Sequence, residues 1–332
     1  MARAWHLMQR PKGLPTTNDV ALKEIELAPL EDGMVHVKND WLSVDPYMRA
    51  RMDDTESYFE AFGLDKPMDG GAVGTVVASK AEGFAQGDKV LTFAGWRDEA
   101  VLPAAAVNKL PELGVDPYHF LANLGLTGGT AWFGLMDVAS AKEGDVVFVS
   151  AAAGAVGSAV VQIAKASGMK VIGSAGGSDK CEFVRSLGAD ACVDYKAGNL
   201  VKALKGALGE IGAKGIDVYF DNVGREHLDA AFAIANNEAR FAECGMIDGY
   251  NHEAPYGFKY IAYIIGKRLQ MKGFIFTDFQ PRMGEFYAAM GPMIAGGQVK
   301  SQETVMDGLE STFDAFLGLF SGANTGKMLV KL

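Results

Sequence analysis

The sequence predicts an α/β protein in which a small, mostly β unit precedes a doubly wound parallel sheet. Its 332 residues are long for a single hydrophobic core, so two domains are expected. The pattern of the chain changes near residue 115. Short strand-like runs separated by Gly, Pro and Asp come before this point. Apolar runs that alternate with helical patterns follow it, as in a parallel sheet covered by helices on both faces.

The first part of the chain contains three clear strand signals. Residues 34–38 alternate apolar and polar side chains, and residues 74–78 form a compact apolar run. Residues 89–93 follow a Gly87-Asp88 turn and form the third run. These short runs predict a small all-β unit.

The second part alternates strands and helices. Its strands are apolar runs, which indicates burial on both faces of the sheet. The expected strands span 145–150, 170–173, 191–195, 216–220 and 239–247, and the expected helices span 156–168, 179–187, 200–208 and 227–235. This alternation is the doubly wound pattern.

Composition limits the partners and the compartment. Hydrophobic residues make up 49% of the chain and charged residues 22%, which is typical of a soluble globular protein. The formal net charge of −10 argues against nucleic acid as the main partner. Three scattered cysteines suit a reducing compartment. The uncharged stretch 146–164 is interpreted as strand, turn and helix, so a cytoplasmic protein without a membrane partner is expected.

The sharpest local signal is S-A-A-A-G-A-V-G-S at 150–158. Against G-x-G-x-x-G, positions 152, 154 and 157 are Ala, Gly and Gly, with a strand before and a helix after. Gly154 lets a pyrophosphate approach the backbone, and Gly157 lets helix and strand pack closely. The helix N-terminus offers N–H groups and partial positive charge. A dinucleotide site is therefore predicted; the alternative is a tight turn without ligand.

The second strand decides which dinucleotide is expected. Its tip, 173–177, has no acidic residue to accept the ribose hydroxyls of NAD. Asp179 lies slightly beyond, and Lys180 follows it. A lysine suits a 2′-phosphate, which an acid would repel. NADP is favoured, and NAD held by Asp179 remains the competing interpretation.

Several other patterns are interpreted as structural. Tyr263 and Lys267 match Y-x-x-x-K of short-chain dehydrogenases, whose chains open with the glycine loop, so a helical segment is expected here. G-A-N-T-G-K at 322–327 is one residue short of a phosphate loop and precedes a strand. The five histidines lie far apart, His252-Glu253 is expected to be a surface pair, and no metal site is expected.

Six motifs spread over nearly the whole chain carry a resemblance to a known family. They are D-P-Y-M-R at 45–49, G-L-T-G-G-T-A-W at 125–132, A-A-A-G-A-V-G-S at 151–158, F-D-N-V-G at 220–224, C-G-M-I at 244–247 followed by Tyr250-Asn251, and G-x-N-x-G-K at 322–327. The chain resembles the medium-chain dehydrogenase/reductase superfamily, and within it the zinc-independent, NADP-dependent alkenal/enone double-bond reductases that include prostaglandin reductases. Zinc-bearing relatives have a Gly-His-Glu motif and a four-cysteine lobe. Here residues 69–74 are D-G-G-A-V-G and no cysteine precedes Cys181, so neither zinc is expected.

The resemblance implies a fold and an assembly. It implies a GroES-like catalytic domain at 1–120, completed by 290–332, and an NADP-binding Rossmann domain at 121–289, with the active site in the cleft between them. Residues 270–276 are expected to be the last strand of the parallel sheet. Its apolar edge is expected to join a second copy in a homodimer.

The resemblance also implies an activity, NADPH-dependent reduction of the C=C bond of α,β-unsaturated aldehydes and ketones. Hydride goes to the β-carbon, and negative charge develops on the carbonyl oxygen, where a donor stabilises it. Tyr250 matches the tyrosine with this role in the plant reductases, and Tyr47 would line the cleft; packing is the alternative for both. The other functions considered are a zinc-free NADPH quinone reductase, against which the 45–49 and Tyr250-Asn251 motifs argue, and a non-catalytic member of the same fold.

The remaining implied residues hold NADP(H). The pyrophosphate would lie against Gly154, Ala155 and Val156, beside Gly157. The 2′-phosphate would be held by Lys180 and Tyr195, the ribose or nicotinamide side by Asn222, and the returning end of the chain would add Asn324. One departure is Gly177, where many relatives have Ser, and the neighbouring Ser178 is expected to compensate.

Overall fold

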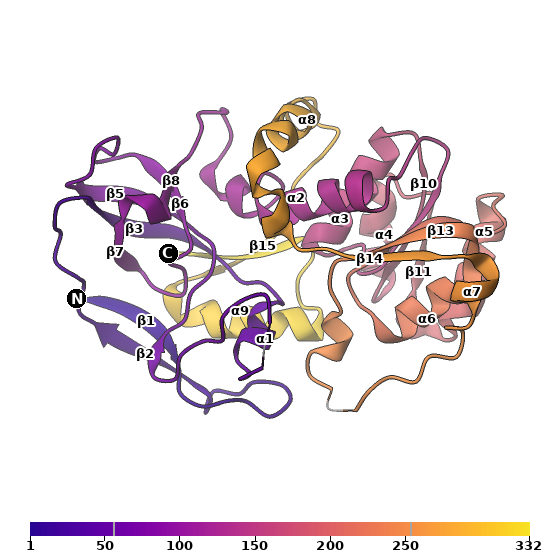
Figure 1. Cartoon of the computed structure of the whole chain (residues 1–332), viewed down its shortest axis with the longest axis horizontal. Helices are drawn as coiled ribbons and strands as arrows, with labels where there is room; N and C mark the ends of the chain where they lie inside the picture. Colours follow the sequence, from indigo (N-terminus) through magenta and orange to yellow (C-terminus); the bar gives the residue numbers. More distant parts are fainter. Residues whose placement is uncertain (56, 253) are drawn as a thin grey trace. The chain divides into compact units, whose positions relative to one another are not determined.

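The computed structural model describes residues 1–55, 57–252 and 254–332. The chain divides into two compact units (Figure 1). The first unit comprises Met1–Leu121, Glu303–Asn324 and Met328–Leu332, and the second comprises Ala122–Gln302 and Thr325–Lys327. Glu253 of the expected surface pair lies outside the described residues.

The first unit is built from β-sheets. Its larger, seven-stranded sheet has the order β15-β16-β3-β5-β6-β8, with β7 paired to β3, and a smaller sheet has the order β2-β1-β4. The strands are β1 (Ala2–Leu7), β2 (Val20–Ile25), β3 (Met34–Ser43), β4 (Lys66–Pro67), β5 (Ala72–Ser79), β6 (Lys89–Thr92), β7 (Glu99–Pro103), β8 (Val107–Lys109), β15 (Glu303–Asp307) and β16 (Lys327–Lys331). Two helices, α1 (Met48–Arg51) and α9 (Thr312–Ser321), accompany them.

Burial along β3 follows the sequence pattern. Val35 and Val37 are fully buried, whereas His36 and Lys38 between and after them are partly exposed or exposed. One face of this strand therefore packs on the core, as the alternating pattern predicted. The predicted strands at 34–38 and 74–78 are confirmed within β3 and β5, and the one at 89–93 is confirmed as β6, which ends one residue earlier, at Thr92.

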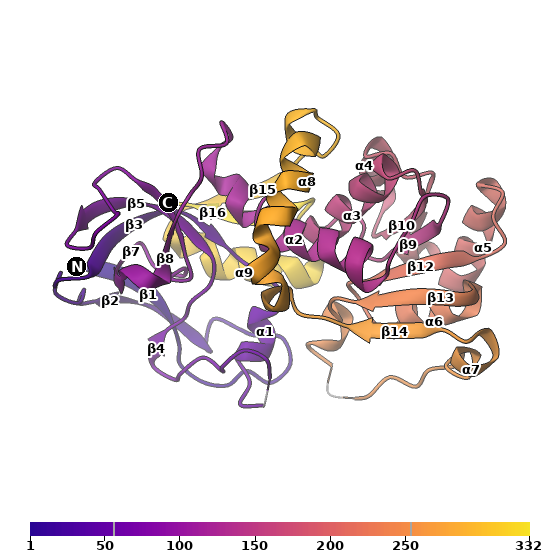
Figure 2. The same cartoon turned by 45° about the horizontal axis from the view of Figure 1, so that its top comes forward.

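The second unit contains a six-stranded parallel sheet of order β11-β10-β9-β12-β13-β14. The strands are β9 (Val146–Val149), β10 (Lys170–Ala175), β11 (Ala191–Asp194), β12 (Ile216–Asp221), β13 (Ala235–Glu243) and β14 (Gln270–Gly273). The helices are α2 (Leu126–Phe133), α3 (Ala155–Ala166), α4 (Ser178–Ser186), α5 (Leu200–Glu210), α6 (Arg225–Ile234), α7 (Tyr263–Lys267) and α8 (Met283–Ala295). The predicted doubly wound sheet is confirmed. Figure 2 shows β12, β13 and β14 side by side, with β14 at the edge.

Aromatic side chains fill the core between this sheet and its helices. The rings of Phe148 and Tyr219, on neighbouring strands, stack with centroids 5.0 Å apart. The rings of Phe232 from α6 and Phe241 from β13 stack at 5.5 Å. All four side chains are almost completely buried, and each contributes about 1.5–3 kcal/mol by leaving water.

The predicted ends of two strands, β13 and β14, need correction. β13 ends at Glu243, not at 247, because the N–H groups of Cys244 and Gly245 turn to the carbonyl of Asp221 at 3.0 and 3.1 Å. β14 ends at Gly273, not at 276, and a short 3₁₀ helix begins at Phe276. The Y-x-x-x-K segment is helical, as predicted, and forms α7.

Residues 290–302 were expected to belong to the first unit, but the structure assigns them to the second. Residues 290–295 of this segment are the end of α8, which packs against α2. The ring of Phe286 lies 6.2 Å from that of Phe133, centroid to centroid. This aromatic contact accounts for the later boundary.

The strand order reverses between β9 and β12. In doubly wound sheets, ligands bind beyond the carboxyl ends of the strands at such a reversal. The loops that leave these ends contain Gly154, Gly177 and Asn222. Among the described residues, no helix is long and apolar enough to cross a membrane.

Candidate active site

The turn between β9 and α3 is shaped by its two glycines. A Cβ on Gly157 would lie 2.3 Å from the carbonyl oxygen of Ala151, so only glycine permits this approach of helix and strand. Gly154 is the N-cap residue of α3 and has no side chain with which to cap the helix. The N–H groups of Ala155 and Val156 belong to the first turn, which makes no intrahelical bonds through its N–H groups. The turn can therefore receive an anion such as a pyrophosphate.

Ala152, which replaces the first glycine of the motif, is accommodated by another glycine. Ala152 is fully buried, and a Cβ on Gly173 of β10 would lie 2.8 Å from the Ala152 Cβ. Gly173 on the neighbouring strand thus leaves the space that the Ala152 side chain occupies. The G-x-G-x-x-G pattern alone could not show this exchange.

The segment Thr325–Lys327 returns to the glycine turn. The Gly326 N–H donates to the carbonyl of Ala153 at 2.7 Å, and Gly326 forms a bridge with Gly154. Gly326 has a φ of +71°, and a Cβ there would lie 1.9 Å from the carbonyl oxygen of Gln302. Within the 322–327 motif, Gly326 therefore binds the turn through its backbone, and Asn324 precedes this segment along the chain.

A cationic cluster lies beyond β10, around Gly176. A Cβ on Gly176 would lie 2.9 Å from both the Lys196 Cε and the Tyr195 hydroxyl, so both side chains extend over this glycine. Burial, and then the charge of Lys196, lower the pKa of Lys180. Two ammonium groups close enough to affect each other favour binding of an anion. Lys196 was not predicted from the sequence, where its place directly after Tyr195 was the available signal.

His227 packs beneath Tyr195 as a neutral ring. The two rings meet edge to face with centroids 5.1 Å apart. Burial lowers the pKa of His227 to about 4, so the imidazole is uncharged at neutral pH. His227 therefore supports the Tyr195 ring and adds no charge to the cluster.

Gly177 has a structural reason to be glycine. Its φ is +104°, a conformation that strains other residues. Its N–H and that of Lys196 both donate to the Asp194 carboxylate, each at 2.9 Å. Ser178, expected to replace the missing hydroxyl, donates instead to Asp179 at 3.1 Å, and both side chains are exposed. Asp179 lies in the first turn of α4, where the helix dipole stabilises a carboxylate.

A buried hydrogen-bond network connects the ends of β9 and β12, between which the strand order reverses. The Asp221 carboxylate accepts from Ser150 Oγ at 3.1 Å and from the Tyr219 hydroxyl at 2.7 Å. The backbone N–H of Asn222 donates to Ser150 Oγ, and its side-chain Nδ2 donates to the Ser150 carbonyl, both at 2.8 Å. The amide nitrogen of Asn222 thus holds the two loops together.

Tyr250 follows the short 3₁₀ turn Ile247–Gly249 and is partly buried. Its hydroxyl oxygen accepts from the Met246 N–H at 3.4 Å. A Cβ on Gly245 would lie 3.3 Å from this oxygen, so Gly245 leaves room for the hydroxyl. The loop carrying Tyr250 is tied to the β12 loop, because Ile247 N–H donates to the Asn222 carbonyl at 3.2 Å. Tyr250 and Asn222 therefore stand on joined loops of the second unit.

Tyr47 belongs to the first unit and directly precedes α1. Its ring stacks on Phe59 with centroids 5.0 Å apart, and Phe59 stacks on Phe93 at 6.0 Å. Burial raises the pKa of Tyr47 well above its ordinary value. Phe93 is 43% exposed, so one end of this three-ring stack reaches solvent in the first unit.

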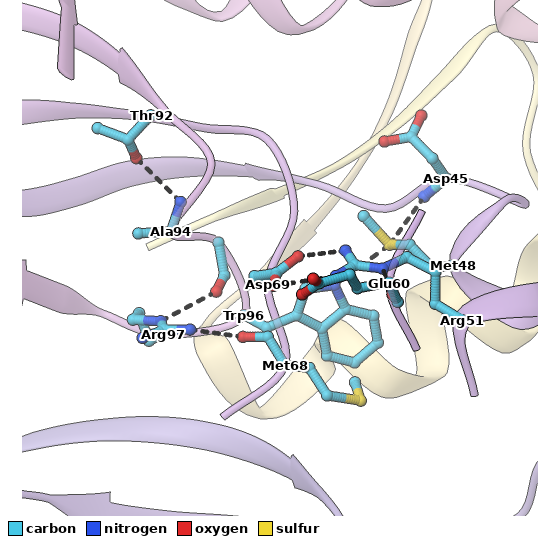
Figure 3. A network of polar contacts seen from close by, with 11 residues as sticks. Asp45, Met48, Arg51, Glu60, Met68, Asp69, Thr92, Ala94, Trp96 and Arg97 are labelled. Carbon is cyan, nitrogen blue, oxygen red and sulfur yellow. Dashed lines mark hydrogen bonds and ion pairs between the residues drawn. The ribbon is translucent and has the colours of Figure 1, made fainter. Parts of the chain in front are cut away.

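Arg51 of α1 lies against this stack, and Figure 3 shows its contacts with Asp69 and Glu60. Its guanidinium carbon lies 5.5 Å from the Phe59 centroid and 5.8 Å from the Phe93 centroid. Both terminal nitrogens donate to the Asp69 carboxylate, and Nε donates to the Glu60 carbonyl at 2.8 Å. The charge of the buried arginine is thereby compensated, as such a group requires.

Other residues of the D-P-Y-M-R motif make contacts within the first unit, and Figure 3 shows those of Asp45 and Met48. The sulfur of Met48 accepts from the Trp96 indole at 3.3 Å and from the Asp45 N–H at 3.5 Å. Buried Arg49 pairs with Asp53 at 2.8 Å. No group of three or more His, Cys, Asp or Glu side chains among the described residues could hold a metal ion.

A doubly wound sheet with a glycine turn, joined to a mostly β unit, defines a nucleotide-dependent oxidoreductase of the medium-chain type. Residues 3–110 match the family described as the N-terminal domain of oxidoreductase, and residues 155–293 match the one described as zinc-binding dehydrogenase. The chain is 36% identical to the NADPH-dependent curcumin reductase of Escherichia coli over 99% of this chain and 96% of that protein. It is 38% identical to the NADP⁺-dependent 2-alkenal reductase of Nicotiana tabacum over 96% and 94%.

A solved structure agrees with these relatives. The crystal structure of CurA in complex with NADPH from Vibrio vulnificus superposes with a TM-score of 0.93 at 40% identity, covering 99% of this chain and 98% of that chain. The chain belongs to the zinc-independent alkenal/enone reductase family of the medium-chain dehydrogenase/reductase superfamily. The GroES-like and Rossmann domains predicted from the sequence are those of this family, and NADP(H) is its cofactor.

Proposed function

We propose that this protein is an NADPH-dependent reductase that saturates the C=C bond of α,β-unsaturated aldehydes and ketones. The supporting observation is the cluster of Lys180, Lys196 and Tyr195 at the end of β10, which suits a 2′-phosphate, in a chain closely similar to curcumin and 2-alkenal reductases. The similarity to these relatives supports the type of reaction, and the cluster supports NADPH over NADH as the cofactor.

The candidate cofactor-binding residues have distinct proposed roles. Ala155 and Val156 donate their N–H groups to the pyrophosphate at the N-terminus of α3, where Gly154 and Gly157 keep the approach open. Lys180 and Tyr195, with Lys196, hold the 2′-phosphate. Asn222 and Asn324 complete the site on the nicotinamide side and on the returning segment.

When bound, NADPH would supply the hydride that forms the new C–H bond at the β-carbon. Negative charge would then develop on the carbonyl oxygen as the substrate becomes an enolate. We assign Tyr250 as the catalytic residue whose hydroxyl donates a hydrogen bond to this oxygen and stabilises the developing charge. One proton taken up from solvent at the α-carbon would complete the saturated carbonyl product. Tyr47, with its stacked Phe59, is proposed to line the substrate site.

The test is NADPH oxidation with 2-alkenals, alkenones and quinones in parallel, with identification of the products. The proposal expects saturated aldehydes and ketones and slow turnover of quinones. Rapid turnover of quinones alone would make the protein a quinone reductase. No turnover of any substrate by protein that binds NADPH would favour a non-catalytic role.

We further propose a homodimer formed through β14. All four residues of this edge strand are exposed, and Ile265 on the adjacent α7 is 83% exposed. An exposed edge strand invites pairing with a second strand. Light scattering at micromolar concentration is expected to give twice the mass of one chain, and Ile265→Lys is expected to lower it while Leu113→Lys, an exposed leucine of the first unit, leaves it unchanged. A mass of one chain for the wild type would refute the dimer.

A cytoplasmic location is proposed from the cysteines. Cys181, Cys192 and Cys244 are all free thiols, which suits a reducing compartment.

A further inference from the structure

Two buried carboxyl groups lie side by side beneath the loops that carry Asn222 and Tyr250. Asp221 ends β12 and Glu243 ends β13, and the two are direct partners in the parallel pairing of these strands. Partners in a parallel pair point to the same face of a sheet. Asp221 is completely buried, and both carboxyl oxygens of Glu243 are shielded from solvent.

The hydrogen bonds of this pair are unevenly distributed. One Asp221 oxygen, Oδ1, accepts from the Tyr219 and Ser150 hydroxyls and from the N–H groups of Val223 and Gly224 at 2.8 and 2.9 Å. Asp221 Oδ2 and both oxygens of Glu243 have no donor among the described residues. A buried carboxylate without a donor is costly, and a carboxyl proton is the donor that this geometry lacks.

The surrounding charges also favour a proton on the pair. Burial, and then the contact with Asp221, raise the pKa of Glu243 to about 9. The other titratable groups that interact with Glu243 are Tyr219 and Cys244, whose pKa values are both raised, mainly by burial. On the β14 side the partner of Glu243 is Gly273, which has no side chain.

The cations on nearby elements have other partners. Lys267 of α7, which packs on β13, donates its ammonium group to the carbonyls of Phe232 and Ala233. On the segment after α2 that also meets β13, Asp137 pairs with Arg282. The carboxyl groups therefore face each other without a cation to offset a second negative charge among the groups named.

The backbone links this pair to the loops above it. The Asp221 carbonyl accepts from the N–H groups of Cys244 and Gly245, and the Val223 carbonyl accepts from Asp248 N–H at 3.2 Å. Ionisation of both carboxyl groups would force apart the ends of β12 and β13. Any such movement passes to the loops that carry Asn222 and Tyr250.

We infer that Asp221 and Glu243 share a single proton, and that this proton positions the cofactor-side and Tyr250 loops. Glu243 is thus a positioning residue, which acts through Asp221 and not on the substrate. Loss of the proton at alkaline pH separates the strand ends and weakens the site. The inference about the proton stands without the reaction, and the inference about positioning rests on the proposed function.

Urea unfolding between pH 6 and 8 tests the shared proton. In this range the folded protein keeps a proton on the pair that the unfolded chain, with an ordinary glutamate, has released. Stability therefore falls as pH rises. The unfolding constant of the wild type should rise relative to that of Glu243→Gln by up to about tenfold per pH unit, because the amide donates to Asp221 without titrating. Glu210→Gln, at an exposed glutamate that ends α5, should keep the wild-type slope. Equal slopes for the wild type and Glu243→Gln would overturn the inference.

NADPH affinity and kcat between pH 7 and 10 test the positioning. Both should decline in the wild type near the ionisation of the pair. In Glu243→Gln, and in Glu243→Met, which serves if the amide variant does not fold, the decline in kcat should disappear and the decline in NADPH affinity should shrink to the part that Lys180 causes. Declines in both variants that are as steep as in the wild type would assign them to other groups and refute the positioning role. NADPH binding is measured without an enone, so a failure of the proposed reaction would leave this readout intact and the two failures distinguishable.

Discussion

Replacement of Lys180 by alanine should weaken NADPH binding and leave NADH binding almost unchanged. Of the two nucleotides, only NADPH has a 2′-phosphate, which a cation at this position would bind. The structure adds Lys196, whose charge acts on Lys180 across the Gly176 turn. We therefore expect Lys196→Ala to act in the same direction but more weakly, because its side chain is exposed and Lys180 is half-buried.

The magnitude follows from the type of contact. A charge-assisted hydrogen bond contributes about 1.5–3 kcal/mol. The partial exposure of Lys180 favours the lower figure, which corresponds to about a tenfold rise in Kd. The pKa of Lys180 is lowered, by burial first and by Lys196 second, so its positive charge is lost at a lower pH than that of an ordinary lysine. NADPH affinity should accordingly fall as pH rises into the alkaline range, and less so in Lys196→Ala.

The assay is fluorescence titration of NADPH and NADH against the wild type, both single variants and the double variant. Lys202→Ala, an exposed lysine of α5, is the matched control and should bind both nucleotides normally. Added salt should reduce the effect of each variant. If the wild type binds NADH as tightly as NADPH, or if Lys180→Ala loses both equally, the assignment is wrong and Asp179 regains the ribose role.

Tyr250→Phe should lower kcat for enones and leave the NADPH Kd nearly unchanged; a donor of this kind can contribute ~2.7–4 kcal/mol, and substitution by water favours the lower end or less. If the chemical step limits the rate and kcat is unchanged, Tyr250 has only a packing role. Dialysis against a strong chelator should leave activity intact, and activity that is lost and then restored by zinc would contradict the assignment of the first unit. Gly157→Ala should destabilise the second unit in thermal unfolding, because its Cβ would meet the Ala151 oxygen at 2.3 Å; an unchanged Tm would show that the turn can relax.

The sequence predicted the sheet of the second unit well because each of its strands is an apolar run between helical patterns. It failed at the ends of β13 and β14, where hydrogen bonds between distant segments decide where a strand stops. The turn from Cys244 to Gly245 depends on the Asp221 carbonyl, and no local pattern of residues announces that partner.

The candidate site also combines residues that a local pattern predicts with residues that depend on contacts between distant segments. Gly154, Gly157 and Lys180 could be predicted as candidates because phosphate binding requires glycine and cations at fixed offsets along the chain. Lys196 was missed because its approach to Lys180 arises from the pairing of β10 with β11. Glu243 was missed because an isolated glutamate within a strand gives no sign that it will be buried beside Asp221.

Transfer of deuterium from 4-deuterated NADPH to a 2-alkenone tests the central claim most directly. Mass spectrometry and NMR of the product should show a saturated ketone that carries the deuterium on its β-carbon. An allylic alcohol with deuterium on the former carbonyl carbon would contradict the account, because it would make the protein a carbonyl reductase.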